Sequence, residues 1–323
     1  MARWGKSGAG FGARSVIEVS EGRFKGCLLG LACGDAVGTT VEFKPRGSFD
    51  PVTDMVGGGP FGLRAGEWTD DTSMALCLAV SLLERDGFDP RDQMDRYVRW
   101  WRTGYLSSNG TCFDIGHTVA RALKRYERTG EPFSGSTDPR SAGNGSIMRL
   151  APVPMMVGED LGRLATYSAE SSRTTHGATE AVDACRLAGV MISLALQGEK
   201  KETILFRTQE REESLRGLAP AIGAIARGSY RGKKGEDIKG SGYVVKSLEA
   251  ALWCFWSTTS YREAILKATN LGDDADTTAA VSGQVAGAYY GVEGIPGEWL
   301  DRLAKRRLIE RLASELWERR GRV

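Results

Sequence analysis

Residues 273–291 read DDADTTAAVSGQVAGAYYG, in which three carboxylates and two hydroxyls stand directly before a run of small and apolar residues. Residues 69–84, TDDTSMALCLAVSLLE, show the same order earlier in the chain. Carboxylates interact favourably with the dipole at a helix N-terminus. Each acidic cluster is therefore predicted to lead into a buried helix, over 73–84 in the first case and 278–289 in the second.

Helical periodicity dominates the rest of the chain, and sustained two-residue alternation is absent from the sequence. An all-α fold follows, with a flexible arm rich in Gly, Ser and Arg over 1–20 and a single domain over 21–323. The other predicted helices cover 24–37, 91–103, 117–128, 160–171, 178–196, 243–256, 261–269 and 298–319.

Two predicted helices carry small residues at four-residue spacing, which places these residues on one face of each helix. A glycine inside a helix costs about 1 kcal/mol relative to alanine, so such a stripe needs a packing reason. We expect the two helices to cross tightly and to bring Glu42 and both acidic turns together. The stripes are Gly26, Gly30, Gly34 and Gly38 in the first helix, and Ala279, Gly283 and Gly287 in the second.

Composition limits the possible functions. The chain has 323 residues, 41% of them hydrophobic, and a formal net charge of +2. A general nucleic-acid or membrane-surface binder would show a strong basic excess, so neither is predicted. The sequence has neither an apolar stretch long enough to span a bilayer nor an apolar signal core, which predicts a cytoplasmic protein. The six cysteines form no CxxC pair, and buried free thiols are expected.

The two clusters together hold five carboxylates, which would repel one another and be costly to bury without a cation. Oxygen ligands without nearby His or Cys suit Mg²⁺ or Mn²⁺ first and Ca²⁺ second. The alternative is that Thr69 and Thr277 are ordinary N-caps with acidic residues in the first turn. Identical Asp-Thr chemistry in both clusters favours the metal.

Other polar motifs surround these clusters. Asp35 and Glu42 follow a glycine-rich helix end, and Asp35 either caps or bonds locally. Asp114, between Phe113 and a glycine two residues on, has a setting that can raise a carboxyl pKa. Residues 143–146, GNGS, form a turn whose amides can hold a phosphate, although such turns often have no ligand. His176 is one of two histidines, and a single histidine is more often structural than catalytic.

The order of these motifs resembles the ADP-ribosylglycohydrolase family, particularly the type that activates dinitrogenase reductase. The matching runs, over about residues 23–291, are GDAVGTTVEF, WTDDTSM, CFDIG, GNGSIMR, TTHG, GYVVKSLEAALW and GDDADTTAAVSGQVAGAYYG. The resemblance implies an orthogonal helical bundle with two Mg²⁺ or Mn²⁺ ions in a cleft. The metal ligands that it implies are Glu42, Thr69, Asp70, Asp71, Asp274, Asp276 and Thr277, whereas Asp273 falls outside the set.

The same resemblance implies roles around the ligand. The candidate catalytic residues are Asp114, Glu42 and Asp71, with Asp114 facing the distal ribose as a catalytic or positioning acid. A metal-free glycosidase with Asp114 and Glu42 as its carboxylate pair is the less favoured version, because it leaves the other acids unused. The implied substrate-binding residues are Gly143, Asn144, Gly145 and Ser146 at the diphosphate or ribose, His176 beside the ligand, and Tyr243 at the nucleotide end.

The implied activity is metal-dependent removal of ADP-ribose from an ADP-ribosylated protein, with arginine as the favoured linkage. A competing hypothesis is an immunity protein that binds and blocks an ADP-ribosylating toxin through the arm 1–20. A phosphohydrolase acting on nucleotides is a third and less favoured possibility. The glycine-rich segment 227–242 is expected to be a solvated loop, with a lid or a protein-contact role as the alternative.

Overall fold

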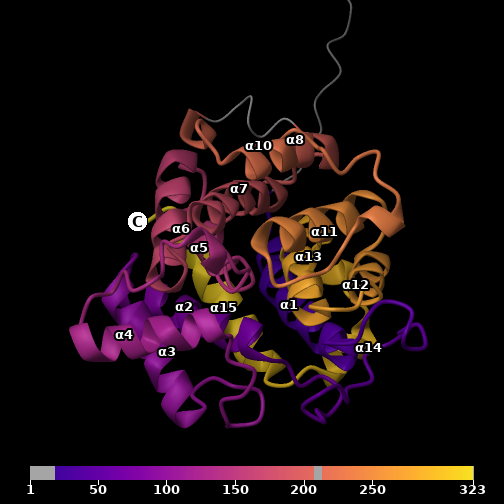
Figure 1. Ribbon diagram of the computed structural model, residues 1–323, viewed down its shortest axis with the longest axis horizontal. Coiled ribbons are helices and arrows are strands. Elements are labelled where there is room, and N and C mark those ends of the chain that lie inside the picture. The colour runs from indigo at the N-terminus through magenta and orange to yellow at the C-terminus, as the bar shows by residue number, and fades with distance from the viewer. Residues whose placement is uncertain (1–18, 207–212, 323) are drawn as a thin grey trace, which may run out of the picture.

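The computed structural model of the chain describes residues 19–206 and 213–322, and in this part the secondary structure is helical (Figure 1). Only isolated β-bridges occur among the described residues, so the predicted all-α class is confirmed. The α-helices are α1 Glu21–Gly38, α2 Asp70–Arg85, α3 Pro90–Thr103, α4 His117–Thr129, α5 Pro152–Val157, α6 Leu161–Thr175, α7 Thr179–Leu196, α8 Lys201–Phe206, α10 Pro220–Ala226, α11 Val244–Trp256, α12 Tyr261–Thr269, α13 Ala275–Tyr290, α14 Gly297–Arg302 and α15 Arg306–Arg319. Short 3₁₀ turns are η1 Thr39–Val41, η2 Pro139–Ser141, η3 Glu213–Leu215, η4 Gly235–Asp237 and η5 Val292–Gly294.

Helices α1 and α13 lie side by side in the middle of the molecule (Figure 1). They run antiparallel, and one small residue per turn of each helix meets its counterpart on the other. A Cβ added to Gly283 would lie 2.2 Å from the carbonyl oxygen of Gly30, and one added to Gly287 would lie 2.0 Å from that of Gly26. A Cβ added to Gly34 would lie 2.3 Å from the carbonyl oxygen of Ala279. The predicted tight crossing is confirmed, and it places the acidic start of α13 at the C-terminal end of α1.

The remaining helices enclose this pair. Helices α7, α11 and α12 pack on α13, whereas α2 and α15 pack on α1. Helix α1 is buried on every face from Cys27 onward, and α13 is buried from Ala275 to Ala288, as expected for helices without a polar face. All six cysteines are free, and five of them are buried, as predicted.

The predicted helix over 298–319 is wrong in one respect, because the structure divides it into α14 and α15. Lys305 adopts a left-handed conformation with φ 52°. The backbone amide of Ala304 donates to the Gly66 carbonyl at 2.9 Å, and the Trp68 indole donates to the Ala304 carbonyl at 3.1 Å. These tertiary hydrogen bonds with the segment before α2 outweigh the local helical pattern.

Three short helices were not predicted from the sequence, namely α5, α8 and α10. Two of them begin with proline, which suits the first turn because proline has no amide hydrogen to leave unpaired. Their six or seven residues cover too few turns to show a helical period.

Helix α1 begins at Glu21, where the folded domain is predicted to begin. Residues 1–18 of the predicted arm lie outside the described residues, so its toxin-blocking role stays a prediction. Deleting residues 1–20 tests it, since unchanged affinity for an ADP-ribosylating toxin would rule that role out. None of the helices in the described part of the chain has the length and apolar character needed to cross a membrane.

Candidate active site

A cleft of about 890 Å³ opens where the C-terminal end of α1, the N-termini of α2 and α13 and the loop before α4 meet. Residues 239–242, within the predicted solvated loop, form part of its wall. Arg46 fixes this loop by donating to the carbonyls of Gly235 and Ile238 at 2.6 and 2.7 Å. Both acidic clusters contribute to the cleft, through Asp70 from one and Asp274, Asp276 and Thr277 from the other.

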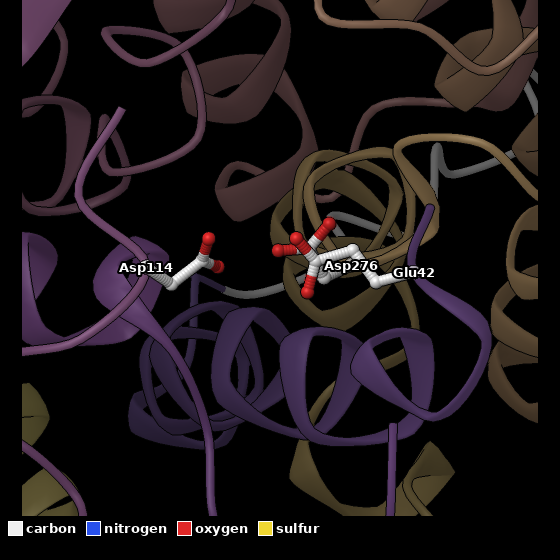
Figure 2. Close-up of side chains that lie close together, drawn as sticks. All are labelled: Glu42, Asp114 and Asp276. Atoms are coloured by element: carbon white, nitrogen blue, oxygen red, sulfur yellow. The ribbon is translucent and has the colours of Figure 1, made fainter. Parts of the chain in front are cut away.

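Three carboxylates converge in this cleft. Glu42, Asp114 and Asp276 each offer an oxygen atom within 4.8 Å of the other two (Figure 2). Glu42 directly follows η1, Asp114 lies in the loop before α4 and Asp276 in the first turn of α13, and in Figure 2 Asp114 faces the other two carboxylates. The family resemblance implied that Glu42 and Asp276 bind metal and that Asp114 faces the distal ribose, and the structure brings all three together.

Backbone hydrogen bonds explain how Glu42 reaches α13. The amide of Phe43 donates to the Asp273 carbonyl at 2.7 Å, and the Asp273 amide donates to the Lys44 carbonyl at 2.8 Å. This reciprocal pair joins the segment after η1 to the turn before α13. These main-chain hydrogen bonds therefore hold Glu42 beside the second acidic cluster, although the carboxylates repel one another.

A second layer of acidic residues lies below the cleft. Asp71 is fully buried, and its Oδ2 atom lies 3.4 Å from the hydroxyls of both Thr69 and Thr277. The Thr69 hydroxyl also lies 3.5 Å from Asp276. Because Thr277 belongs to α13 and Asp71 to α2, these contacts join the two acidic motifs in space. Thr277 lies inside α13, whose N-cap is Asp274, so the alternative of Thr277 as a cap is wrong.

Burial and mutual repulsion govern the protonation of this cluster. Burial, followed by the charge of Asp114, raises the pKa of Glu42 to about 9. Burial, together with Asp35 and Asp274, raises the pKa of Asp114 to about 8. Burial also raises the pKa of Asp276 well above its ordinary value, and the same holds for Asp70 and Asp71. At neutral pH these acids therefore favour a bound proton or a cation.

The donor set fits a hard divalent cation. The Oδ1 atoms of Asp71 and Asp276 are buried and accept no hydrogen bond from the described residues. A buried carboxylate oxygen without a donor is costly unless an ion satisfies it. The cluster supplies only carboxylate and hydroxyl oxygens, which are the ligands of Mg²⁺ and Mn²⁺ rather than of zinc.

We predict that Mn²⁺ stabilises the protein more at about pH 8.5 than at about pH 5. Glu42 and Asp114 have folded pKa values above their unfolded values, so their contribution to stability is complete at low pH and is lost as pH rises through about 8 to 9. A cation that binds the ionised cluster restores this loss. Thermal unfolding with EDTA or Mn²⁺ at both pH values measures it, and an equal shift at both would contradict the prediction.

The GNGS turn is tied to the second acidic cluster. The Asn144 side chain donates to Asp274 at 2.6 Å and to the Ser247 hydroxyl at 3.1 Å. Its backbone amide donates to the Gly242 carbonyl at 3.0 Å, which fixes the turn against the start of α11. Gly143, Asn144 and Gly145 line the cleft, whereas the Ser146 hydroxyl is buried and accepts from Ser172.

The position of the His176 ring explains why residues 143 and 145 of this turn are glycines. A Cβ on Gly145 would lie 2.8 Å from the His176 ring, and one on Gly143 would lie 3.3 Å from it. The ring is 2% exposed, and its Nδ1 atom lies 2.9 Å from the Thr175 hydroxyl. Burial, helped by the charge of Arg149, lowers the pKa of His176 to about 3. The imidazole is therefore neutral, and it forms a wall of the cleft.

Tyr243 follows Gly242, which lines the cleft, but Tyr243 itself is not one of the lining residues and is 40% exposed. Its hydroxyl donates to Glu180 at 2.7 Å, and this contact holds the ring between α7 and α11. The role of Tyr243 at the nucleotide end stays a prediction.

A model of the ADP-ribosylglycohydrolase family matches residues 18–323. The chain belongs to this family. It is 48% identical over 306 residues to the ADP-ribosylarginine hydrolase Tri1 of Pseudomonas putida (strain GB-1), a match that covers 95% of the chain and 81% of the relative. The ADP-ribosyl-[dinitrogen reductase] glycohydrolase of Rhodospirillum rubrum is 32% identical over 288 residues, covering 87% and 90%. A solved structure described as an ADP-ribosylglycohydrolase-related protein complex superposes with a TM-score of 0.82 at 43% identity, covering 93% of this chain and 98% of the other.

Two buried residues of this glycohydrolase support the cleft and were missed as site residues. Asp35 accepts four hydrogen bonds from the start of α2, from the amides and hydroxyls of both Thr69 and Thr72 at 2.6 to 3.0 Å. It was expected to cap or bond locally, yet its partners lie 34 and 37 positions away. The Arg149 guanidinium donates to the Gly145 carbonyl at 2.7 Å and to the Thr175 hydroxyl at 2.8 Å. The sequence feature that could have identified Arg149 is the position of an arginine within an apolar segment.

Phe43 combines two costly features at the mouth of the cleft. Its φ is 62°, a conformation that bulky residues rarely adopt, and its side chain is 64% exposed. We predict that the Phe43→Gly variant is more stable than Phe43→Ala by about 1 kcal/mol, because only glycine removes the backbone strain. Denaturant unfolding of both variants measures this difference. Equal stabilities would show that the backbone at this position is not strained.

Proposed function

We propose that this enzyme hydrolyses the bond between ADP-ribose and a protein arginine, with two Mg²⁺ or Mn²⁺ ions in the acidic cleft. The convergence of Glu42, Asp114 and Asp276 carries the proposal, because these carboxylates would attract a cation within a cleft large enough for a nucleotide ligand. The arginine linkage is supported by the Tri1 relative, which is named an ADP-ribosylarginine hydrolase. A cytoplasmic location is part of the same proposal.

The residues that would hold the two ions are those that the resemblance implied: Glu42, Thr69, Asp70, Asp71, Asp274, Asp276 and Thr277. When bound, the ions would neutralise the carboxylates, offer coordination to ribose hydroxyls and lower the pKa of water. Asp35 supports this set by fixing the backbone of the α2 start, and Asn144 supports it by orienting Asp274. Both contacts restrict carboxylate or hydroxyl rotation, as outer partners of metal ligands do.

Asp114 is the best placed of the candidate catalytic acids to move a proton at the glycosidic bond. It lines the cleft opposite Glu42 and Asp276, and it belongs to a loop rather than to either acidic helix. Asp71, by contrast, is fully buried below the cleft, where a ligand role suits it better. We therefore assign proton transfer at the leaving nitrogen to Asp114, within hydrogen-bond reach of the substrate once bound.

The other wall of the cleft would hold the ADP-ribose. In the 143–145 turn the amides of Gly143 and Asn144 already donate to the carbonyls of Ser141 and Gly242, so the Gly145 amide would bind the diphosphate, with His176 as a neutral wall. Ser146 would act indirectly, since its hydroxyl bonds inside the core. Tyr243 would stack on the adenine from the rim.

The experiment is release of ADP-ribose from an ADP-ribosyl-arginine protein, measured with Mg²⁺, with Mn²⁺ and with EDTA. Intact ADP-ribose released only with metal supports the proposal. Release of AMP or phosphate instead would indicate a phosphohydrolase. Release from serine-linked but not from arginine-linked substrate would retain the family chemistry and overturn the linkage.

A further inference from the structure

A second hollow, of about 810 Å³, lies along the exposed face of α4. Four cationic side chains line it, Arg121, Lys124, Arg125 and Arg128. Arg121, Arg125 and Arg128 follow one another at spacings of four and three residues, which places them on one side of the helix. The opposite side of α4 is buried through Val119, Leu123 and Tyr126. Because this packing fixes the rotation of the helix about its axis, the cations remain on the side that faces the hollow.

Among the described residues no Asp or Glu forms an ion pair with any of these four cations. The single acid of α4, Glu127, pairs instead with Arg102 of α3 at 2.6 Å. Like charges so close together on a helix repel one another, and the arrangement is stabilised by an anionic partner.

The facing wall of the hollow is rigid and rich in hydroxyls. Ser134, Ser136, Thr137 and Ser141 line it, together with Asp138. Asp138 pairs with Arg140 at 2.8 Å, and its pKa is lowered first by Arg140 and also by the charge of Arg121. The carbonyl of Ser136 accepts from the Gly177 amide at 3.0 Å, which ties this wall to the residue after His176. The hollow is thus a groove lined by four cations and one acid.

This groove joins the active-site cleft. Thr118, in the first turn of α4, lines both hollows. From Thr118 to Arg128 the helix rises by about 15 Å. An extended peptide spans that distance with about four or five residues. A chain whose modified side chain enters the cleft would therefore pass its next few residues over the cations.

We propose that the groove along α4 binds an acidic segment of the protein substrate, within about five residues of the ADP-ribosylated side chain. This inference rests on the proposed action on protein. Carboxylates of the substrate would face Arg121, Lys124, Arg125 and Arg128, while the groove hydroxyls would bind its main chain. The groove thereby adds sequence preference to a cleft that recognises ADP-ribose.

A nucleic acid fits the groove less well than a peptide. The chain carries 43 basic and 41 acidic residues, without the basic excess expected of a nucleic-acid-binding protein. None of the groove-lining residues is aromatic, so bases would have no stacking surface.

The test compares two ADP-ribosyl-arginine peptides that differ only in carrying Asp or Asn three to five residues from the arginine, on either side. The readout is KM for each peptide relative to KM for free ADP-ribosyl-arginine. For the wild type we expect KM to be about tenfold lower with Asp, since each exposed ion pair contributes modestly. The double variant Arg121→Glu and Arg125→Glu should remove this preference, and peptides with Lys at the same positions should then bind better.

The control is Arg307→Glu with Arg311→Glu, which makes the same charge change at the same spacing on the exposed part of α15 and also removes the exposed ion pair of Arg311 with Glu315 at 3.7 Å. It should keep the preference for Asp. Equal KM values for both peptides in the wild type would overturn the proposal, and so would loss of the preference in the control. Displacement of the Asp peptide by a short single-stranded DNA at lower concentration than by unlabelled peptide would also overturn it, in favour of a nucleic-acid site.

Failure of the proposed function would be visible separately. If the wild type releases no ADP-ribose from free ADP-ribosyl-arginine, the assigned activity is wrong whatever the groove binds. Fluorescence anisotropy of labelled, unmodified Asp and Asn peptides then tests the groove by itself. Tighter binding of the Asp peptide, lost in the α4 variant alone, supports the groove, and equal binding overturns it.

Discussion

Replacing Asp276 with asparagine is expected to lower kcat/KM for ADP-ribosyl-arginine hydrolysis by more than about 100-fold, because loss of an outer partner of a metal ligand alone can cost that much. Asp276 is 2% exposed, lies beside Glu42 and Asp114, and has one oxygen without a donor. Asparagine keeps the shape but removes the charge that would hold a cation. Initial rates across a Mn²⁺ titration measure the loss.

The same substitution should stabilise the fold when metal is removed. Burial and the neighbouring acids raise the Asp276 pKa well above its ordinary value, so keeping Asp276 buried at pH 8 costs stability, either as a desolvated charge or through proton uptake, and a neutral amide avoids this cost. We expect the melting temperature in EDTA to rise while the shift caused by Mn²⁺ shrinks. Opposite effects on stability and activity exclude unfolding as the cause of inactivity.

Asp273→Asn is the matched control, three positions earlier. Asp273 is exposed at the cleft, and asparagine tolerates its left-handed backbone, with φ 55°. Activity should change by a few-fold at most. If Asp276→Asn keeps near-normal, metal-dependent turnover, then Asp276 is no ligand and the two-cluster site is wrong.

The sequence predicted those parts of the site that depend on local pattern. The acids before α2 and α13 were recognisable because a helix start, its dipole and an apolar continuation lie within one stretch of chain. The crossing of α1 and α13 was also predictable, since stripes such as Gly26 and Gly30 have few explanations besides close backbone approach.

The parts that were missed depend on distant partners. Asp35 looked like a local cap because the sequence does not show that the α2 start lies above it. The break at Lys305 arises from hydrogen bonds made by neighbouring residues to the segment before α2, which helical periodicity cannot reveal. The contact from Asn144 to Asp274 joins two motifs that were interpreted separately, as a phosphate turn and a metal ligand.

The Gly283→Ala substitution should destabilise the protein by about 2 to 3 kcal/mol or more, because the added methyl would overlap main chain rather than a movable side chain. Its Cβ would lie 2.2 Å from the Gly30 carbonyl oxygen and 2.8 Å from the carbonyl carbon. The Gly30 carbonyl already accepts from the Tyr261 hydroxyl at 2.6 Å, so α1 cannot withdraw without losing that bond. Denaturant unfolding of the metal-free protein measures the change.

Gly162→Ala provides the comparison, since Gly162 is a helical glycine whose Cβ would come no closer than 3.6 Å to another atom. The Gly162→Ala variant should have a free energy of unfolding up to about 1 kcal/mol higher than the wild type, through helix propensity alone. Because Gly283 lies two turns after Asp276 in α13, forcing α1 and α13 apart also separates Asp276 from Glu42, which follows α1. Gly283→Ala should therefore weaken the response of the melting temperature to Mn²⁺, whereas Gly162→Ala should not. If the Gly283→Ala protein is as stable as the wild type, then α1 and α13 can move apart at little cost in stability. The glycine stripe would then need another explanation.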